Sequence, residues 1–280
     1  MKTCSRYRPV CPIFGSSGGF TLTELLVAIG IVILLAGISF PFVLQARMAA
    51  WKAVSINSLR QLTTANLVYA LDRGRFVSTG NLRTPINNVR WSGQKISGNN
   101  FDPTKGLLSP YLGKSNKITS CPLLVHMIQK QKAGYSFELD GGGFGYNDYI
   151  GGNLPCYPND VANGLSIARK PDEIQNPSKT IMFGSSAYAI KSGVQEYPFL
   201  EVPFQIAKSG TLLDTRPSPS LHFRFNGNAL VSWCDGRVTQ EKMDPRTPGS
   251  NPHGGDADKE YLGWFGPDEE NGYWNPHIQH

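Results

Sequence analysis

The sequence has none of the complete motifs by which common enzyme classes are recognised. Residues 113–115, Gly-Lys-Ser, match the end of a phosphate-binding loop, but Leu108 stands where the first glycine of that loop belongs. Residues 184–187, Gly-Ser-Ser-Ala, do not have the spacing of a nucleophile elbow. The five histidines include no pair at i and i+4. We therefore expect a protein that is not an enzyme.

Zinc-binding cysteine pairs and a strong basic charge are also missing. The chain has five cysteines but no Cys-x-x-Cys pair, so a zinc site is not expected. The formal net charge is +6, and Lys2, Arg6 and Arg8 fall in the first 19 residues, which contain no acid. The rest of the chain keeps a charge of about +3, which is too small to indicate nucleic acid as a partner.

What the sequence does have is a long apolar run with an acid at its start. Residues 25–46 carry no charged side chain. As a helix that rises about 1.5 Å per residue, this run covers roughly 33 Å, close to the thickness of a hydrocarbon core. Because a carboxylate in a membrane helix costs about 2.5–3.5 kcal/mol, we expect Glu24 to have a partner. Gly30 and Gly37 allow close helix packing, and Pro41 predicts a kink.

Residues 19–24, Gly-Phe-Thr-Leu-Thr-Glu, followed by this run, resemble the class III signal of type IV prepilins and type II secretion pseudopilins. The resemblance implies that a prepilin peptidase cuts between Gly19 and Phe20 and methylates the new amino group of Phe20. It also implies that Glu24 neutralises the amino group of Phe20 on a neighbouring subunit and so sets the register of assembly. The alternative is a plain signal anchor that is never cut.

The first 19 residues also predict the orientation of the chain. They are basic and have no apolar stretch of their own, so they should stay in the cytoplasm. We expect a single-pass protein of the inner membrane with a periplasmic globular domain, or a cell-surface location within a filament. By the resemblance, its partners are prepilin peptidase, the inner membrane, an assembly platform and other pilin or pseudopilin subunits.

The helical pattern continues beyond the apolar run. After Arg47 the apolar residues recur roughly at helical spacing to about Leu71, and residues 72–74, Asp-Arg-Gly, should end the helix. The expected fold is α+β, a pilin-like lollipop whose long N-terminal transmembrane helix packs on a small antiparallel β-rich head domain. The expected parts are a cleaved leader at 1–19, a transmembrane half-helix at 20–46, an amphipathic half-helix at 47–74 and a globular β-rich extracytoplasmic domain at 75–280.

Two turn dipeptides between short apolar segments form the clearest pattern in the head. The Asn226-Gly227 and Asp235-Gly236 pairs favour type I′ turns, in which both central residues have positive φ. Residues 221–225, 228–234 and 237–240 therefore predict a three-stranded meander, and residues 180–183 predict a further strand. In the middle strand, one face should carry Ala229, Val231 and Trp233, and the other Leu230, Ser232 and Cys234.

The same segment resembles the C-terminal signature of the H-X9-DG prepilin-like proteins. The spacing to the Asp-Gly pair at 235–236 fits, but Phe225 replaces the signature histidine and Arg237 replaces the histidine that often follows the pair. His222 lies three residues too early to substitute. The resemblance therefore implies a structural hairpin framed by Arg224 and Asp235, with no metal or acid–base role for a histidine. Residues 121–122, 145–147 and 176–180 also resemble parts of that family.

Three cysteines lie beyond the expected leader, on the side of the membrane where disulfides persist. Cys121 and Cys156 lie in loop-like sequence, so a disulfide between them and two free thiols are both compatible with the sequence. A disulfide would contribute about 3–4 kcal/mol. Cys234, in the predicted strand, should be a buried small apolar residue.

The tail is rich in acidic side chains, among them Asp256, Asp258, Asp268 and Glu269. Oxygen-rich loops can bind Ca²⁺, and residues 266–272 are faintly similar to the calcium loop of the major pseudopilins. No EF-hand spacing is present, so a solvated acidic loop is the simpler expectation. Calcium is the one cofactor that the sequence suggests.

Together these patterns predict a structural subunit of a type IV pilus-like or type II secretion pseudopilus filament. The alternatives are a minor pilin, or a membrane-tethered module that binds polysaccharide or DNA. The number of copies per cell would separate a major subunit from these alternatives. Stacking surfaces for a binding module would come from Tyr135, Phe137, Phe144, Tyr146, Tyr149, Tyr157, Trp264, Phe265, Tyr273 and Trp274.

Overall fold

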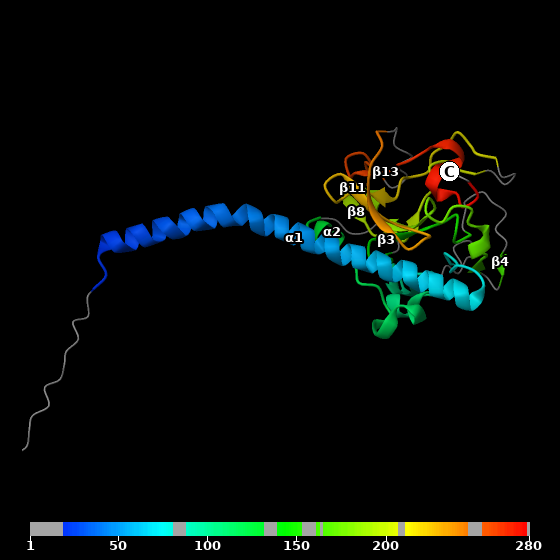
Figure 1. The fold of residues 1–280 in the computed structure, drawn as a ribbon, viewed down its shortest axis with the longest axis horizontal. Helices are drawn as coiled ribbons and strands as arrows, with labels where there is room; N and C mark the ends of the chain where they lie inside the picture. The colour runs from blue at the N-terminus through cyan, green and yellow to red at the C-terminus, as the bar shows by residue number, and fades with distance from the viewer. Residues whose placement is uncertain are drawn as a thin grey trace, which may run out of the picture. The chain divides into compact units, whose positions relative to one another are not determined.

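The fold is α+β, with one long apolar N-terminal helix and a separate β-rich region of mainly antiparallel sheets (Figure 1). The chain divides into two compact units, Met1–Arg47 and Met48–His280. The computed structural model describes residues 19–80, 88–131, 139–152, 161–162, 165–206, 211–245 and 254–278.

The long helix α1 runs from Leu22 to Arg73, a length of 52 residues. It ends at Gly74, whose φ of +71° reverses the chain and whose N–H donates to the carbonyl of Ala70 at 2.8 Å. This is the glycine-terminated end that the sequence predicts. Pro41 lies within the helix, and the kink expected there stays a prediction.

The second half of α1 supplies one wall of the main hydrophobic core. Leu59, Leu62 and Ala65 are buried and pack in the same cluster as strand residues of the head. Asn66, on the same part of the helix, accepts a hydrogen bond from the N–H of Val77 at 2.8 Å. The amphipathic half-helix is therefore part of the head's core.

A five-stranded sheet lies at the centre of the head, in the order β12-β11-β6-β3-β9. Adjacent strands within this sheet pair antiparallel, except β3 and β9, which pair parallel. The predicted strand at 180–183 is confirmed as β6. The strands are β3 (Phe144–Asn147), β6 (Ile181–Ser185), β9 (Phe199–Leu200), β11 (Asn228–Trp233) and β12 (Val238–Lys242).

The two faces of this sheet cover two different hydrophobic clusters. Leu230 of β11 and Cys234, which directly follows it, join the cluster that includes α1, which we call the helix-side cluster. Ala229, Val231 and Trp233 join a second cluster, which contains Trp264, Phe265 and Trp274 and is called the C-terminal cluster. The predicted alternation of faces is confirmed. Since burying each large side chain contributes about 1.5–3 kcal/mol, both faces stabilise the head.

The predicted three-stranded meander is only partly correct. The hairpin of β11 and β12 is confirmed, and Asn226 (φ +55°) and Gly227 (φ +75°) form the expected type I′ turn. The segment before that turn does not continue as a neighbouring strand, because β6 and β12 already occupy the two edges of β11. Instead, β10 (Leu221–His222) pairs with β13 (Leu262–Gly263).

The second turn is also different from the prediction. Among residues 234–236 only Gly236 has a positive φ, +93°, so the turn is not type I′. The N–H of Gly236 donates to Trp233 O at 3.0 Å, and the N–H of Trp233 donates to Arg237 O at 2.9 Å. These bonds define a three-residue loop with glycine at the left-handed position, which is the next most common hairpin connection.

The remaining elements are short and lie around the central sheet. Three hairpins are formed by β1 with β2, by β4 with β5 and by β7 with β8. Their bounds are β1 (Gln94–Ser97), β2 (Asn100–Asp102), η1 (Pro103–Lys105), η2 (Ser109–Tyr111), η3 (Gly113–Ser115), α2 (Pro122–Gln129), β4 (Val161–Ala162), β5 (Leu165–Ser166), η4 (Pro171–Glu173), β7 (Tyr188–Ile190), β8 (Gly193–Gln195) and η5 (Glu269–Trp274).

Two glycines in this sheet region should differ in their sensitivity to alanine. At Gly227 an added Cβ meets no atom within 4 Å, so Gly227→Ala should cost only the left-handed backbone strain, about 1–2 kcal/mol of unfolding free energy. At Gly145 the added Cβ would lie 2.6 Å from the carbonyl oxygen of Phe199, so Gly145→Ala should cost more. Urea unfolding of both variants measures the difference, and an equal loss would contradict it.

Candidate functional site

A reciprocal cap between Thr21 and Glu24 closes the N-terminal end of α1. The N–H of Thr21 donates to Glu24 Oε2 at 2.9 Å, and the Thr21 hydroxyl donates to the same oxygen at 2.7 Å. In return, the N–H of Glu24 donates to Thr21 Oγ1 at 3.3 Å. This arrangement is a capping box, with threonine at the N-cap and glutamate three residues later. Glu24 therefore has a local role in starting the helix.

The cap uses only one of the two carboxylate oxygens of Glu24. Both donors reach Oε2, and among the described residues no hydrogen bond to Oε1 is formed. The side chain is exposed, and a carboxylate can accept up to about four hydrogen bonds. A cationic group can therefore bind Oε1 while the cap stays closed.

The first half of α1 exposes apolar side chains around its circumference. Leu22 is 76% exposed and Leu34 is 64% exposed, although both are large and apolar. The helix is long and apolar enough to cross a membrane, and none of its most apolar stretch is buried within the protein. A core helix of a soluble protein would be mostly covered. This half of α1 is consistent with a membrane anchor.

Small residues leave room on this surface for another helix. An added Cβ at Gly30 or at Gly37 meets no atom within 4 Å. The hydroxyl of Ser39 donates to the carbonyl of Leu35 at 2.8 Å, so this polar group is satisfied within its own helix. Small residues with satisfied polar groups permit close helix packing in lipid.

Similarity to known proteins does not assign this chain to a family. No family model, no curated protein and no solved structure matches it. The function must therefore be argued from the geometry and from the signal-like block at residues 19–24. Residues 1–18, which include most of the expected leader, lie outside the described part of the chain.

The expected hairpin signature holds together two distant turns. Asp235 accepts hydrogen bonds from Arg237, from its N–H at 2.9 Å and its Nε at 3.0 Å. The N–H of Asp235 donates to Pro177 O at 3.1 Å, and the N–H of Cys234 donates to Thr180 O at 2.9 Å. The loop at 234–236 and the turn at 176–180 are therefore joined by hydrogen bonds. This contact could not be predicted from either sequence motif alone.

Arg224 acts as a buried backbone clamp. Its guanidinium donates to the carbonyl of Gly143 at 2.6 Å and to that of Ser186 at 3.0 Å. Its third partner is Nδ1 of His222, at 3.0 Å. Arg224 thus links the turn before β3, the end of β6 and β10, which is a structural role.

The neighbouring residues also have structural roles. Burial, and next the charge of Arg224, lower the pKa of His222 well below its usual value, so the ring is neutral at physiological pH. Phe225, in the position of the signature histidine, is 3% exposed and belongs to the helix-side cluster. A phenylalanine here fills the core, and the exposed Arg237 binds Asp235.

The cysteines have different environments. The sulfur of Cys121 is buried and accepts a hydrogen bond from Ser55 Oγ at 3.3 Å. Burial raises the pKa of this thiol, but Arg224 and the Ser55 hydroxyl outweigh it, and the net shift is downward. Cys156 lies outside the described residues, so the pairing of these two stays a prediction. Cys234 is buried as expected, and burial raises its pKa.

The candidate calcium residues make local contacts. Asp256 accepts a hydrogen bond from the N–H of Lys259 at 3.1 Å, and Asp268 pairs with Arg216 at 3.0 Å. Asp258 and Glu269 are exposed. Within the described ranges no group of three or more metal-ligating side chains lies together. Calcium binding in this tail therefore stays a prediction.

Most of the aromatic candidates for ligand stacking fill the core. Tyr135, Phe137 and Tyr157 lie outside the described residues, and Tyr273 is partly buried. The buried ones are Phe144, Tyr146, Tyr149, Trp264, Phe265 and Trp274. An aromatic platform for polysaccharide or DNA does not form from these six side chains.

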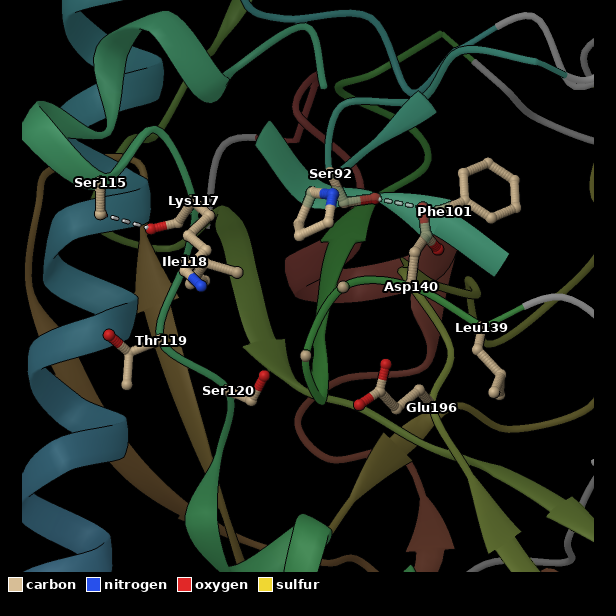
Figure 2. A pocket seen from close by; sticks show the side chains of 13 residues that line it. Ser92, Phe101, Ser115, Lys117, Ile118, Thr119, Ser120, Leu139, Asp140 and Glu196 are labelled. Carbon is tan, nitrogen blue, oxygen red and sulfur yellow. Dashed lines mark hydrogen bonds between the residues drawn. The ribbon is translucent and has the colours of Figure 1, made fainter. Parts of the chain in front are cut away.

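Sequence reasoning missed a hollow of about 410 Å³ beside the segment at 139–142 (Figure 2). Its lining includes the carboxyl groups of Asp140 and Glu196 and the hydroxyl of Ser120. The elements that bring them together are far apart in sequence, so no spacing reveals the site. The one available signal was the triple glycine at 141–143, whose residues all have positive φ.

Proposed function

We propose that this protein is a structural subunit of a type IV pilus-like or type II secretion pseudopilus filament, released from its leader by cleavage between Gly19 and Phe20. The observation that carries the proposal is Glu24 at the start of an exposed apolar helix, with one carboxylate oxygen used by the cap and the other open. In the assembled filament, Oε1 receives the amino group of Phe20 from the neighbouring subunit.

Free energies support a second partner for Glu24. A carboxylate within a membrane helix costs about 2.5–3.5 kcal/mol. The capping box offsets only about 1 kcal/mol of this, the usual contribution of an N-cap. A neighbouring ammonium would offset the remainder, and it would do so only when the two subunits are in the correct register. The same contact would therefore drive assembly and define its geometry.

The head is held rigidly on the second half of α1, which supports this proposal. Because Leu59, Leu62 and Ala65 of α1 belong to the head's core, the head cannot rotate freely about the second half of the helix. Each added subunit would then carry its head in a fixed orientation on residues 48–73. Such a subunit suits a helical array, in which each contact repeats.

Intact mass measurement and N-terminal sequencing test the proposal. Protein from sheared-surface fractions should begin at N-methylated Phe20 and lack the mass of residues 1–19. A chain found only in membranes, with those residues still attached, would contradict it and indicate a plain signal anchor. A Gly19→Leu variant should accumulate uncut and provides the mass standard for the unprocessed chain.

A further inference from the structure

The hollow of Figure 2 lies wholly within the head, on the side of the segment that connects η3 to α2. Its volume of about 410 Å³ is enough for a small organic ligand. Apolar side chains form part of the wall, and Glu196, Ser120 and Asp140 supply polar groups. The apolar part consists of Phe101, Pro103, Ile118 and Leu139.

The two carboxyl groups of the hollow have different partners. Asp140 is buried and ion-paired with Arg90 at 3.0 Å, and it accepts a hydrogen bond from the hydroxyl of Ser92 at 2.6 Å. Glu196 follows β8, and in the described part of the chain no ion pair joins it to a basic side chain. Figure 2 shows its carboxyl on the side of Ser120. Of the two carboxyl groups, Glu196 is therefore the one without an ion pair among the described residues.

The surroundings of Glu196 raise its pKa into the neutral range. Burial and, to a smaller extent, the charge of Asp140 raise its pKa, which lies at about 7. The N–H of Gly142 and the charge of Arg224 act in the opposite direction. Lys117 is exposed at the rim of the hollow. Among the described residues, the N–H of Gly142 is the one backbone donor that acts on this partly buried carboxyl group.

We propose that this hollow binds a primary ammonium group, with Glu196 as its anionic partner and the apolar wall around its alkyl chain. An ammonium supplies the positive charge and the three N–H donors that this carboxylate lacks. A neutral polyol brings no charge, and an anion would be repelled by Glu196 and Asp140. The ammonium could belong to a small amine or to a lysine side chain of a partner protein.

Calorimetric titration of the full chain in non-ionic detergent tests this site. Butylammonium chloride should bind with a millimolar Kd, a range suited to a ligand of five heavy atoms, whereas 1-butanol should not bind. Glu196→Gln keeps the shape of the side chain and should weaken butylammonium binding at least tenfold. Asp258→Asn removes an exposed acid elsewhere and should leave the Kd unchanged. Lys117→Met removes the rim cation and should leave the Kd unchanged or lower it.

The pH dependence is a second readout of the same site. Because only ionised Glu196 attracts the ammonium, affinity should rise several-fold from pH 6 to pH 8, and binding at pH 7 should release protons. Circular dichroism melting checks that each variant is folded. Equal Kd values for butylammonium and butanol, or an unchanged Kd in folded Glu196→Gln, would overturn the proposal.

Two ligands distinguish the sources of the ammonium. If Nα-acetyl-lysine methylamide binds at least tenfold more tightly than butylammonium, the site is built for a lysine of a partner protein. If both bind equally, a small free amine is the natural ligand. Either result supports the ammonium site. The filament proposal is independent of it, because none of these residues lies near Glu24 in the chain.

Discussion

Replacing Glu24 by Gln is expected to lower the yield of sheared filaments at least tenfold while insertion and leader cleavage continue. Gln at this position can still accept the hydrogen bonds from Thr21, so the capping box stays intact. What the amide lacks is the negative charge that binds the amino group of Phe20 on the neighbouring subunit. Quantitative immunoblotting of sheared and membrane fractions measures the yield, and N-terminal sequencing measures cleavage.

Thr21→Ala is the matched control for the Glu24 variant. It removes the threonine hydroxyl from the cap and weakens the start of the helix by about 1 kcal/mol, but it leaves the carboxylate in place. Filaments should therefore persist in Thr21→Ala and disappear in Glu24→Gln. The opposite pattern would mean that the cap, and not the charge, is what assembly requires, and it would remove the main support for the proposed function.

Replacing Asn147 by Ala is expected to lower the unfolding free energy of the head by about 3–5 kcal/mol. The amide of this fully buried residue donates to Ile181 O at 2.8 Å and to Trp274 O at 2.9 Å, and its oxygen accepts from the N–H of Tyr149 at 3.0 Å. Alanine would leave three buried backbone groups without partners, each at a cost of about 1–3 kcal/mol, partly relieved by water. Urea unfolding monitored by tryptophan fluorescence measures the loss.

Asn147→Asp tests whether the hydrogen bonds or only the shape of the residue matter. An aspartate in this place directs an oxygen at two carbonyl oxygens, so its folded pKa should rise above the unfolded value of about 3.9. Its protonated form is then favoured by folding, so the variant should gain stability relative to the wild type as the pH falls from 7 to 4. A pH-independent difference, or a loss below 1 kcal/mol for Asn147→Ala, would contradict this role.

The sequence predicts the local features of this protein well. The end of α1 follows from Gly74, and the turn at Asn226-Gly227 follows from the need for two positive φ angles. The alternation along β11 follows from the period of two in a strand. Each of these depends on a few neighbouring residues, so the chain itself contains the information.

Features that depend on distant segments could not be predicted. The strand at 221–225 was expected to pair with one edge of β11, but β6 pairs there instead. No local sequence pattern predicts which of the two segments pairs with this edge. The loop at 234–236 differs from a type I′ turn because Cys234 and Asp235 bond to residues 177–180. The hollow beside Glu196 likewise requires five segments to meet. Asn271, which binds both backbone groups of Phe204, is another such case.

The place of α1 in the core also has a consequence for biosynthesis. Leu59 and Leu62, near the beginning of the chain, share a cluster with Leu230 and Cys234, near its end. Long-range contacts of this kind form late and leave apolar surface uncovered until then. While the ribosome is still translating the middle of the chain, the apolar stripe on residues 48–73 has no sheet to cover it. The nascent protein therefore exposes this stripe until β11 emerges and the sheet can cover it.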